Sequence, residues 1–136
     1  MTQPVWMLDS AILAIHHRQL SEHGGLAGIR DRGLLESALM RPRNLWGYSD
    51  PKPDLAMLAA AYAFGIAKNH PFLDGNKRTA FVVSETFLNV NGISLDAGAE
   101  DRYITFLKLA EGTLSEVELA SWIREGLRKV SLDEST

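Results

Sequence analysis

One short segment of this 136-residue chain gathers the side chains best suited to chemistry. It reads His70-Pro71-Phe72-Leu73-Asp74-Gly75-Asn76-Lys77-Arg78-Thr79-Ala80. A histidine titrates near neutrality, so His70 suits a general base that takes the proton from an attacking hydroxyl. Asp74 suits a ligand of Mg²⁺, because carboxylate and phosphate oxygens are the ligands that this ion prefers. The segment therefore indicates phosphate chemistry.

The segment lies where one predicted helix ends and another begins. An apolar stretch from Leu55 to Ala67 precedes it and a second, from Thr79 to Val90, follows it. Pro71 forces the break, because proline lacks an N–H and disfavours helical geometry in the residue before it. The N–H groups from Gly75 to Arg78 then have no partner within the second helix and lie at the positive end of its dipole. Such a helix start is a ready site for anions.

The other side chains of the segment fit a bound phosphate. Lys77 and Arg78 add positive charge, and the planar guanidinium of Arg78 can bind two phosphate oxygens at once. Gly75 lets a ligand approach closely, Asn76 can hydrogen-bond a phosphate or the loop backbone, and Phe72 is expected to fix the loop between the helices. Each residue alone has an ordinary interpretation, such as a helix cap or a solvated charge. Their compatible roles in one turn favour a site.

The segment resembles the signature of the Fic superfamily, His-Pro-Phe-x-(Asp/Glu)-Gly-Asn-Gly-Arg-x-x-Arg. Seven positions match, while Lys77 replaces the second glycine and Phe81 replaces the final arginine. Both departures mark the Doc ("death on curing") branch, whose members are small toxins of toxin–antitoxin pairs. The stretch from Gly24 to Asp31 and the following residues Leu34 to Ala38 also resemble the N-terminal region of Doc. The resemblance covers nearly the whole chain and implies an all-α, compact Fic/Doc-like bundle.

The resemblance also implies a function. The chain is expected to be a toxin kinase that uses ATP and Mg²⁺ to phosphorylate a hydroxyl of a protein, by analogy elongation factor Tu, and so halts translation. It implies these roles: His70 as the base, Asp74 as the Mg²⁺ ligand, and Gly75, Asn76, Lys77 and Arg78 as the phosphate cradle. AMP transfer, as in most Fic relatives, is the close alternative. A non-catalytic anion-binding module and an RNase are further alternatives, although a basic surface is missing for the RNase.

A possible inhibitory motif lies near the end of the chain. Residues 121–126 fit the pattern (Ser/Thr)-x-x-x-Glu-(Gly/Asn) of self-restrained Fic proteins. In those relatives the glutamate pairs with the last arginine of the signature, and here that position is Phe81, so Glu125 would lack its partner. We therefore expect restraint by a separate antitoxin chain, which in Doc relatives inserts a helix into a groove beside the motif.

Composition agrees with one cytoplasmic domain, residues 1–136. A chain of this length can bury a sufficient core. The net charge of −3 argues against a general nucleic-acid binder, and the absence of cysteine fits the cytoplasm. The N-terminus lacks the basic start and apolar core of a signal peptide. The stretch from Leu55 to Ala67 is too short to cross a membrane, so it is expected to be the central buried helix.

Two helices are expected before the motif. Asp9 or Ser10 can cap the first, which stops at Gly24-Gly25. Asp31 can cap the second, which is expected to end at Arg41-Pro42.

The irregular segment 43–53 is rich in proline and glycine and is expected to be a loop. By resemblance it would be a flap that aligns the target, with Trp46 and Tyr48 facing substrate. A surface loop anchored by these two aromatic residues is an equally good interpretation.

The C-terminal part predicts a short β pair and two helices. Asn91-Gly92 makes a turn, and Ile93 to Leu95 is expected to be a strand that pairs with Val5 and Trp6. Of the two helices that follow, the second opens with a capping box at Ser115 to Glu118. Residues 131–136 are expected to be a frayed tail.

Three histidines, His16, His17 and His23, lie on the first predicted helix and at its end. Their spacing does not suit a metal site, because His16 and His17 point in different directions on a helix. Side chains that face solvent or a partner are the favoured interpretation.

Overall fold

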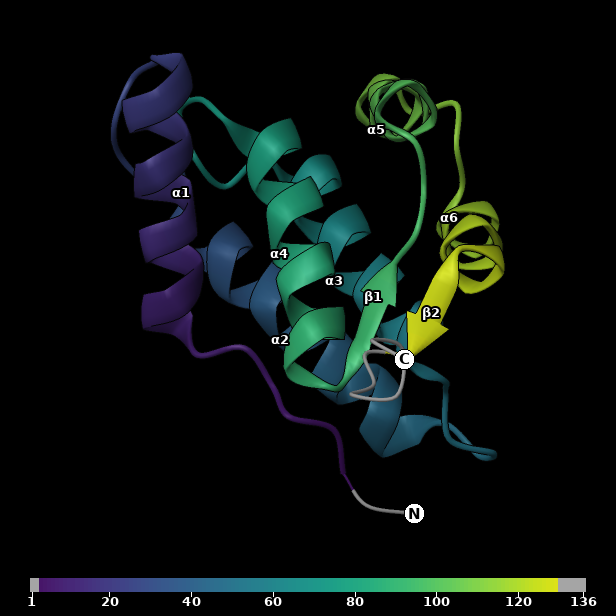
Figure 1. Cartoon of the computed structure of the whole chain (residues 1–136). Helices are drawn as coiled ribbons and strands as arrows, with labels where there is room; N and C mark the ends of the chain where they lie inside the picture. Colours follow the sequence, from purple (N-terminus) through teal and green to yellow (C-terminus); the bar gives the residue numbers. More distant parts are fainter. Residues whose placement is uncertain (1–2, 130–136) are drawn as a thin grey trace.

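The computed structural model describes residues 3–129 and consists mainly of α-helices (Figure 1). In chain order the elements of this part are α1 Asp9–His23, α2 Arg32–Tyr48, α3 Leu55–Asn69, α4 Asn76–Val90, β1 Ile93–Leu95, α5 Ala99–Glu111, α6 Glu116–Glu125 and β2 Leu127–Lys129. The predicted helical bundle with one short β pair is therefore confirmed. The predicted frayed tail, 131–136, lies outside the described residues.

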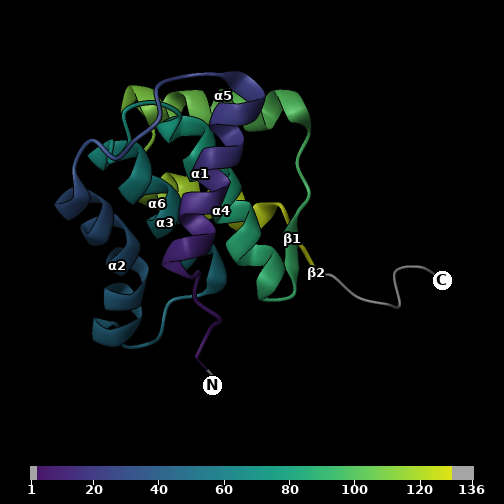
Figure 2. The same cartoon turned by 90° about the vertical axis from the view of Figure 1, so that its left-hand side faces the viewer.

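Helix α3 is the centre of the fold, as its apolar sequence predicts. Most of its residues are buried, and it packs against α2, α4 and α6, while α1 crosses the outer side of α4 (Figures 1 and 2). Small side chains let the helices approach closely, since a Cβ on Gly65 would lie 3.3 Å from the Cα of Ala38 in α2. The contact between α3 and α4 holds the turn that joins them, residues 70–75, at one end of the core. No helix within residues 3–129 combines the length and apolar character needed to span a bilayer.

Helix α2 is longer than predicted. The sequence predicts an end at Pro42, but the helix continues through Pro42 to Tyr48. A proline inside a helix costs about 3 kcal/mol, and burial of a large apolar side chain contributes about 1.5–3 kcal/mol. Pro42 is buried, and Leu45 and Trp46 pack against the core, so burial offsets the proline. The predicted loop over 43–53 is therefore helical in its first half.

The predicted helix caps are partly correct. Asp31 caps α2, and Ser115 opens the capping box of α6, as predicted. The cap predicted for α1 at Asp9 or Ser10 is wrong, because the N-cap residue is Leu8 and no side chain caps this helix. Asp9 instead lies in the first turn, where its negative charge interacts favourably with the helix dipole.

The strand predicted at 93–95 is present, but its predicted partner is wrong. Strand β1 pairs antiparallel with β2, with Ile93 opposite Lys129, and does not pair with Val5 and Trp6. The side chain of Asn91 holds Val5 instead. Its Oδ1 accepts the Val5 N–H at 2.8 Å, and its Nδ2 donates to the Val5 carbonyl at 3.0 Å. The side-chain amide of Asn91 thus makes the hydrogen bonds to the Val5 backbone that a paired strand was expected to make.

Asp54 links the start of α3 to α6. Its carboxylate caps α3 by accepting the Met57 N–H at 2.9 Å, and it accepts a bond from Arg124 in α6, with 2.7 Å between Oδ2 and Nε. The hydrogen bond from Arg124 is the main reason that the pKa of Asp54 lies below its usual range. Stabilisation by this carboxylate is therefore present at neutral pH and is lost as the pH falls through the depressed pKa.

We expect Asp54→Ala to lower the free energy of unfolding by about 1–2 kcal/mol, because the helix cap is lost. Asp54→Asn is the matched control, since asparagine caps a helix nearly as well but carries no charge. Urea unfolding at neutral and acidic pH measures both effects. The stability difference between the wild type and Asp54→Asn should shrink in acid, and a difference that is constant with pH would contradict the role given to the charge.

Candidate active site

The predicted catalytic and phosphate-binding residues lie in the turn between α3 and α4 and in the first turn of α4. Helix α3 ends at Asn69, and its C-cap residue, His70, has a left-handed backbone (φ 49°, ψ 55°). Helix α4 begins after Gly75, which is also left-handed (φ 79°, ψ 14°). Pro71 disfavours the ordinary helical conformation at His70. The left-handed conformation costs a non-glycine residue about 1–2 kcal/mol. Backbone strain of this kind clusters at functional sites.

Asn76 fixes this turn from within. Its Oδ1 accepts the Phe72 N–H at 3.0 Å, and its Nδ2 donates to the Phe72 carbonyl at 2.9 Å. Both Asn76 and the Phe72 ring are buried. Of the two roles predicted for Asn76, the structure shows the bond to the loop backbone.

The same amide contacts the ring of His70, which is exposed. The Nδ2 atom of Asn76 lies 3.4 Å from Nδ1 of His70. Because the bonds to Phe72 orient the amide, Nδ1 is the acceptor in this contact, and the neutral ring carries its proton on Nε2. The contact is long, so it engages the lone pair of Nδ1 only weakly. In this tautomer Nδ1 carries the one lone pair of the ring that can take a proton, so a substrate hydroxyl would reach it by displacing the contact with Asn76.

The segment between α1 and α2, residues 24–31, forms a clamp that holds the outside of the turn through backbone hydrogen bonds. The N–H groups of Arg30 and Asp31 donate to the Pro71 carbonyl at 2.6 and 3.2 Å, and the Leu73 N–H donates to the Gly28 carbonyl at 3.1 Å. The sequence does not reveal this clamp, because its signal is a run of glycines that indicates only a turn.

The Arg30 side chain ties the end of α3 to this clamp. Its Nε donates to the His70 carbonyl at 2.6 Å, and its Nη2 donates to the Asn69 carbonyl at 2.7 Å. Carbonyls at a helix end lack helical partners and carry partial negative charge, so a guanidinium stabilises them. Arg30 therefore holds the backbone of His70, a role that sequence analysis missed because no motif connects the two positions.

His16 is buried beneath the turn, so the prediction that it faces solvent or a partner is wrong. It is only 6% exposed. Its Nε2 lies 2.8 Å from the Asp74 carbonyl oxygen, and its ring stacks on Phe72 with 3.7 Å between centroids. A carbonyl can only accept, so Nε2 carries the proton. His17 and His23 are exposed, as predicted.

We expect His16→Ala to lower the free energy of unfolding by about 2–4 kcal/mol, because it removes a buried ring and leaves the Asp74 carbonyl without its partner. His17→Ala, on the exposed face of the same helix, is the control and should change stability by less than about 0.5 kcal/mol. Urea unfolding compares the two variants. Equal stability of both would show that His16 does not support the turn.

Two positive charges stand at the start of α4. Lys77 is partly buried, with its Nζ 5.6 Å from the ring centroid of Tyr103, and Arg78 is exposed. Within residues 3–129 neither side chain forms an ion pair. The first-turn N–H groups lack helical partners and lie at the positive end of the dipole. The start of α4 can therefore bind a polyanion through N–H groups and two cations.

Asp74 is the candidate metal ligand. Its carboxylate is exposed, and its Oδ2 accepts the Leu26 N–H at 2.7 Å. The part of the chain that the structure describes holds no group of three or more His, Cys, Asp or Glu side chains able to bind a metal by themselves. One carboxylate beside bound phosphates fits Mg²⁺, which proteins often hold through one or two carboxylates together with substrate phosphates and water.

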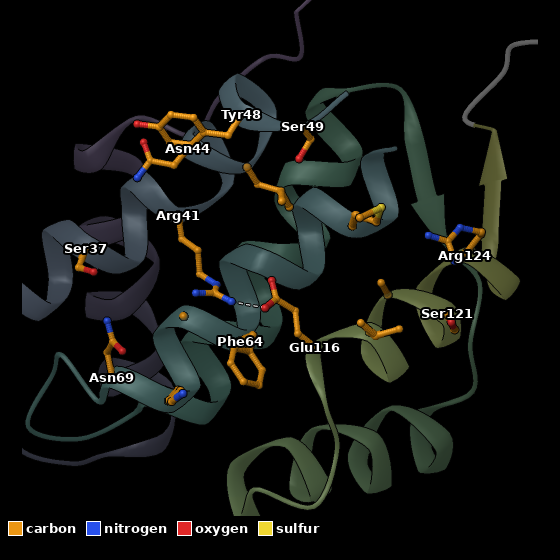
Figure 3. A pocket seen from close by; sticks show the side chains of 16 residues that line it. Ser37, Arg41, Asn44, Tyr48, Ser49, Phe64, Asn69, Glu116, Ser121 and Arg124 are labelled. Atoms are coloured by element: carbon orange, nitrogen blue, oxygen red, sulfur yellow. Dashed lines mark hydrogen bonds and ion pairs between the residues drawn. The ribbon is translucent and has the colours of Figure 1, made fainter. Parts of the chain in front are cut away.

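A separate cavity of about 610 Å³ lies between α2, α3 and α6 (Figure 3). Tyr48 lines it at the end away from Asn69, the residue before His70. Trp46 packs edge-on against Trp6, with 6.4 Å between centroids. Both predicted flap residues thus belong to the end of a helix rather than to a loop, and the structure brings neither of them to the turn.

Comparisons with known proteins agree with the signature. The family model described as Fic/DOC family matches residues 6–88. The chain is 45% identical over 74 residues to Toxin Doc from Mycolicibacterium smegmatis, a match that covers 54% of this chain and only 57% of that protein. It is 32% identical over 113 residues to Protein kinase doc from Escherichia phage P1, which covers 83% of this chain and 88% of that protein. These matches confirm the predicted resemblance.

Proposed function

We propose that this chain, which belongs to the Fic/DOC family, is a toxin kinase that transfers the γ-phosphate of ATP to a hydroxyl of a protein. The observation that carries the proposal is one ordered turn that places the exposed His70 beside the cationic start of α4. The names of the two relatives, a toxin and a protein kinase, support the same activity.

In the proposed step, the hydroxyl oxygen of the target attacks the γ-phosphorus. The bond between that phosphorus and the bridging β–γ oxygen breaks, and ADP leaves. His70 takes the proton of the hydroxyl. Lys77, Arg78 and the N–H groups of the first turn hold the phosphate oxygens, so that catalysis rests on positioning and charge stabilisation.

Asp74 would hold Mg²⁺ together with the phosphates. When bound, the ion neutralises negative charge that develops on the transferred and departing phosphates. The hydrogen bond from the Leu26 N–H to Oδ2 orients the carboxylate of Asp74, and Oδ1 takes no part in that bond.

Two residues favour transfer of phosphate over transfer of AMP. Lys77 adds bulk and charge where the Fic signature has glycine. Phe81 stands where the signature has its last arginine, and its ring packs against Phe106 with 4.8 Å between centroids. The anion site of the usual Fic arrangement is therefore altered at both positions. By resemblance to Doc, the nucleotide binds reversed, with its γ-phosphate beside His70.

We also propose a partner and a target. The target is a translation factor, elongation factor Tu by resemblance, and a separate antitoxin chain restrains the toxin. Glu125, in the possible inhibitory motif, is exposed near the end of α6. Phe81 offers it no cation, so restraint from within the chain lacks its usual partner.

The proposal is tested by incubating the purified protein with cell lysate and ATP labelled at either the α or the γ position, with and without Mg²⁺. Label from the γ position that enters a protein only with Mg²⁺ supports the kinase. Label from the α position would identify an AMP transferase instead. No label in protein would favour a binding module, and cleavage of added RNA would favour a nuclease.

A further inference from the structure

A second cavity, of about 540 Å³, opens directly beside the cationic start of α4. It lies between α4 and α5, and its larger side chains are Lys77, Arg78, Phe81, Arg102, Tyr103 and Phe106. Its volume falls within the range of about 300–1,000 Å³ typical of small-molecule sites. The cavity therefore continues the candidate phosphate site into a space large enough for the rest of a nucleotide.

Three cationic side chains line this cavity, but they differ in how far their charge is compensated. The positive charge of Arg102 is balanced by Glu85, because its Nη1 lies 3.1 Å from Oε2 of that carboxylate. Its Nη2 also donates to the Leu95 carbonyl at 2.8 Å. Lys77 and Arg78 have no such carboxylate within residues 3–129. The uncompensated charge thus lies at the first turn of α4, toward the turn that carries His70.

Aromatic rings adjoin these charges, since the Nζ of Lys77 lies 5.6 Å from the ring centroid of Tyr103 and the guanidinium of Arg102 lies 5.7 Å from that of Phe81. Phe81, one helical turn beyond Lys77, packs against Phe106 in α5 at a tilt of 58°. Tyr103 is 63% exposed, although it is one of the large apolar side chains of α5. Stacking on an aromatic ring contributes to the binding of nucleic-acid bases whatever their identity. An exposed ring beside two cations is therefore suited to a ligand with a planar base and a phosphate chain.

We infer that this cavity binds the nucleoside end of a nucleoside triphosphate, with the base against Tyr103 and Phe81 and the phosphates at Lys77 and Arg78. This inference rests on the proposed function and deepens it. With the nucleoside between α4 and α5, the phosphate chain runs toward the first turn of α4, so the terminal phosphate is the one nearest His70. The position of the base thereby accounts for transfer of the γ-phosphate. It also gives Phe81 a role that an arginine would not fill.

Binding of Mg-ATP and of Mg-tripolyphosphate, measured by calorimetry, tests the inference. Tripolyphosphate has the phosphate chain without the nucleoside. Tyr103→Ala should weaken ATP binding by about 5- to 150-fold, the range expected for one stacked base. It should change tripolyphosphate binding by less than about twofold, because Lys77 and Arg78 remain. Tyr103→Phe keeps the ring and should bind ATP as the wild type does.

Ile104→Ala is the matched control, since Ile104 is a neighbouring, 41% exposed residue of α5 that does not line the cavity. It should bind both ligands as the wild type does. The inference is overturned if ATP and tripolyphosphate bind the wild type equally well, or if Tyr103→Ala weakens both ligands to the same extent. ATP binding that is insensitive to Tyr103 would overturn it while leaving the phosphate site intact. Failure of both ligands to bind would instead remove the phosphate site and the proposed function with it.

Discussion

His70→Ala should give a folded protein that phosphorylates its target about 10²–10⁴-fold more slowly than the wild type, because general-base catalysis is lost. The His70 side chain is exposed, and its hydrogen bond is the long contact with Asn76, so its removal leaves the turn in place. The bond from Arg30 uses the backbone carbonyl and survives the substitution. Single-turnover rates at saturating ATP measure the effect, together with circular dichroism to confirm the fold.

His70→Asn is the companion variant for this test. Asparagine adopts the left-handed conformation more readily than most residues, so it relieves the backbone strain while removing the imidazole. Both variants should show the same loss in the rate of target phosphorylation and should bind ATP as the wild type does. Wild-type rates in both would remove His70 from the reaction.

Asp74→Asn should lower the Mg²⁺-dependent rate by at least about 100-fold, because the metal loses its charged protein ligand. Asparagine can still accept the Leu26 N–H through its side-chain oxygen, so the clamp around the turn is kept. The measurement is the rate of transfer as a function of Mg²⁺ concentration.

Asp74→Ala separates the two roles of this carboxylate. It removes the metal ligand and the Leu26 bond together, so we expect the same loss of rate and an additional loss of about 1 kcal/mol in stability. Asp74→Asn with the Mg²⁺ dependence of the wild type would show that the ion is held elsewhere.

The local parts of this molecule could be predicted from its sequence. Helix α3 follows from an apolar stretch, and the caps at Asp31 and Ser115 follow from residue types at helix starts. The site residues could be named together because they are neighbours along the chain. Pro71 and Gly75 set the geometry of the turn through their own backbone preferences.

What the sequence could not predict depends on contacts between distant residues. His16 and Arg30 support the turn from other elements, and nothing in their spacing identifies residues 70 and 74 as their partners. Helix α2 continues through Pro42 because packing outweighs a local rule. Strand β2 is three residues long and mostly polar, so its pairing with β1 leaves no pattern of alternating side chains to find.

The most direct test of the kinase proposal is the mass of the modified target. Purified elongation factor Tu, or the protein that carries label in lysate, is incubated with this chain, ATP and Mg²⁺, and its intact mass and fragment masses are determined. We predict the addition of one phosphoryl group to a hydroxyl-bearing side chain, with at most about 1% as much addition in the same time when His70→Ala replaces the wild type. Addition of an adenylyl group by the wild-type protein would contradict the proposed transfer of the γ-phosphate and the reversed nucleotide on which it depends.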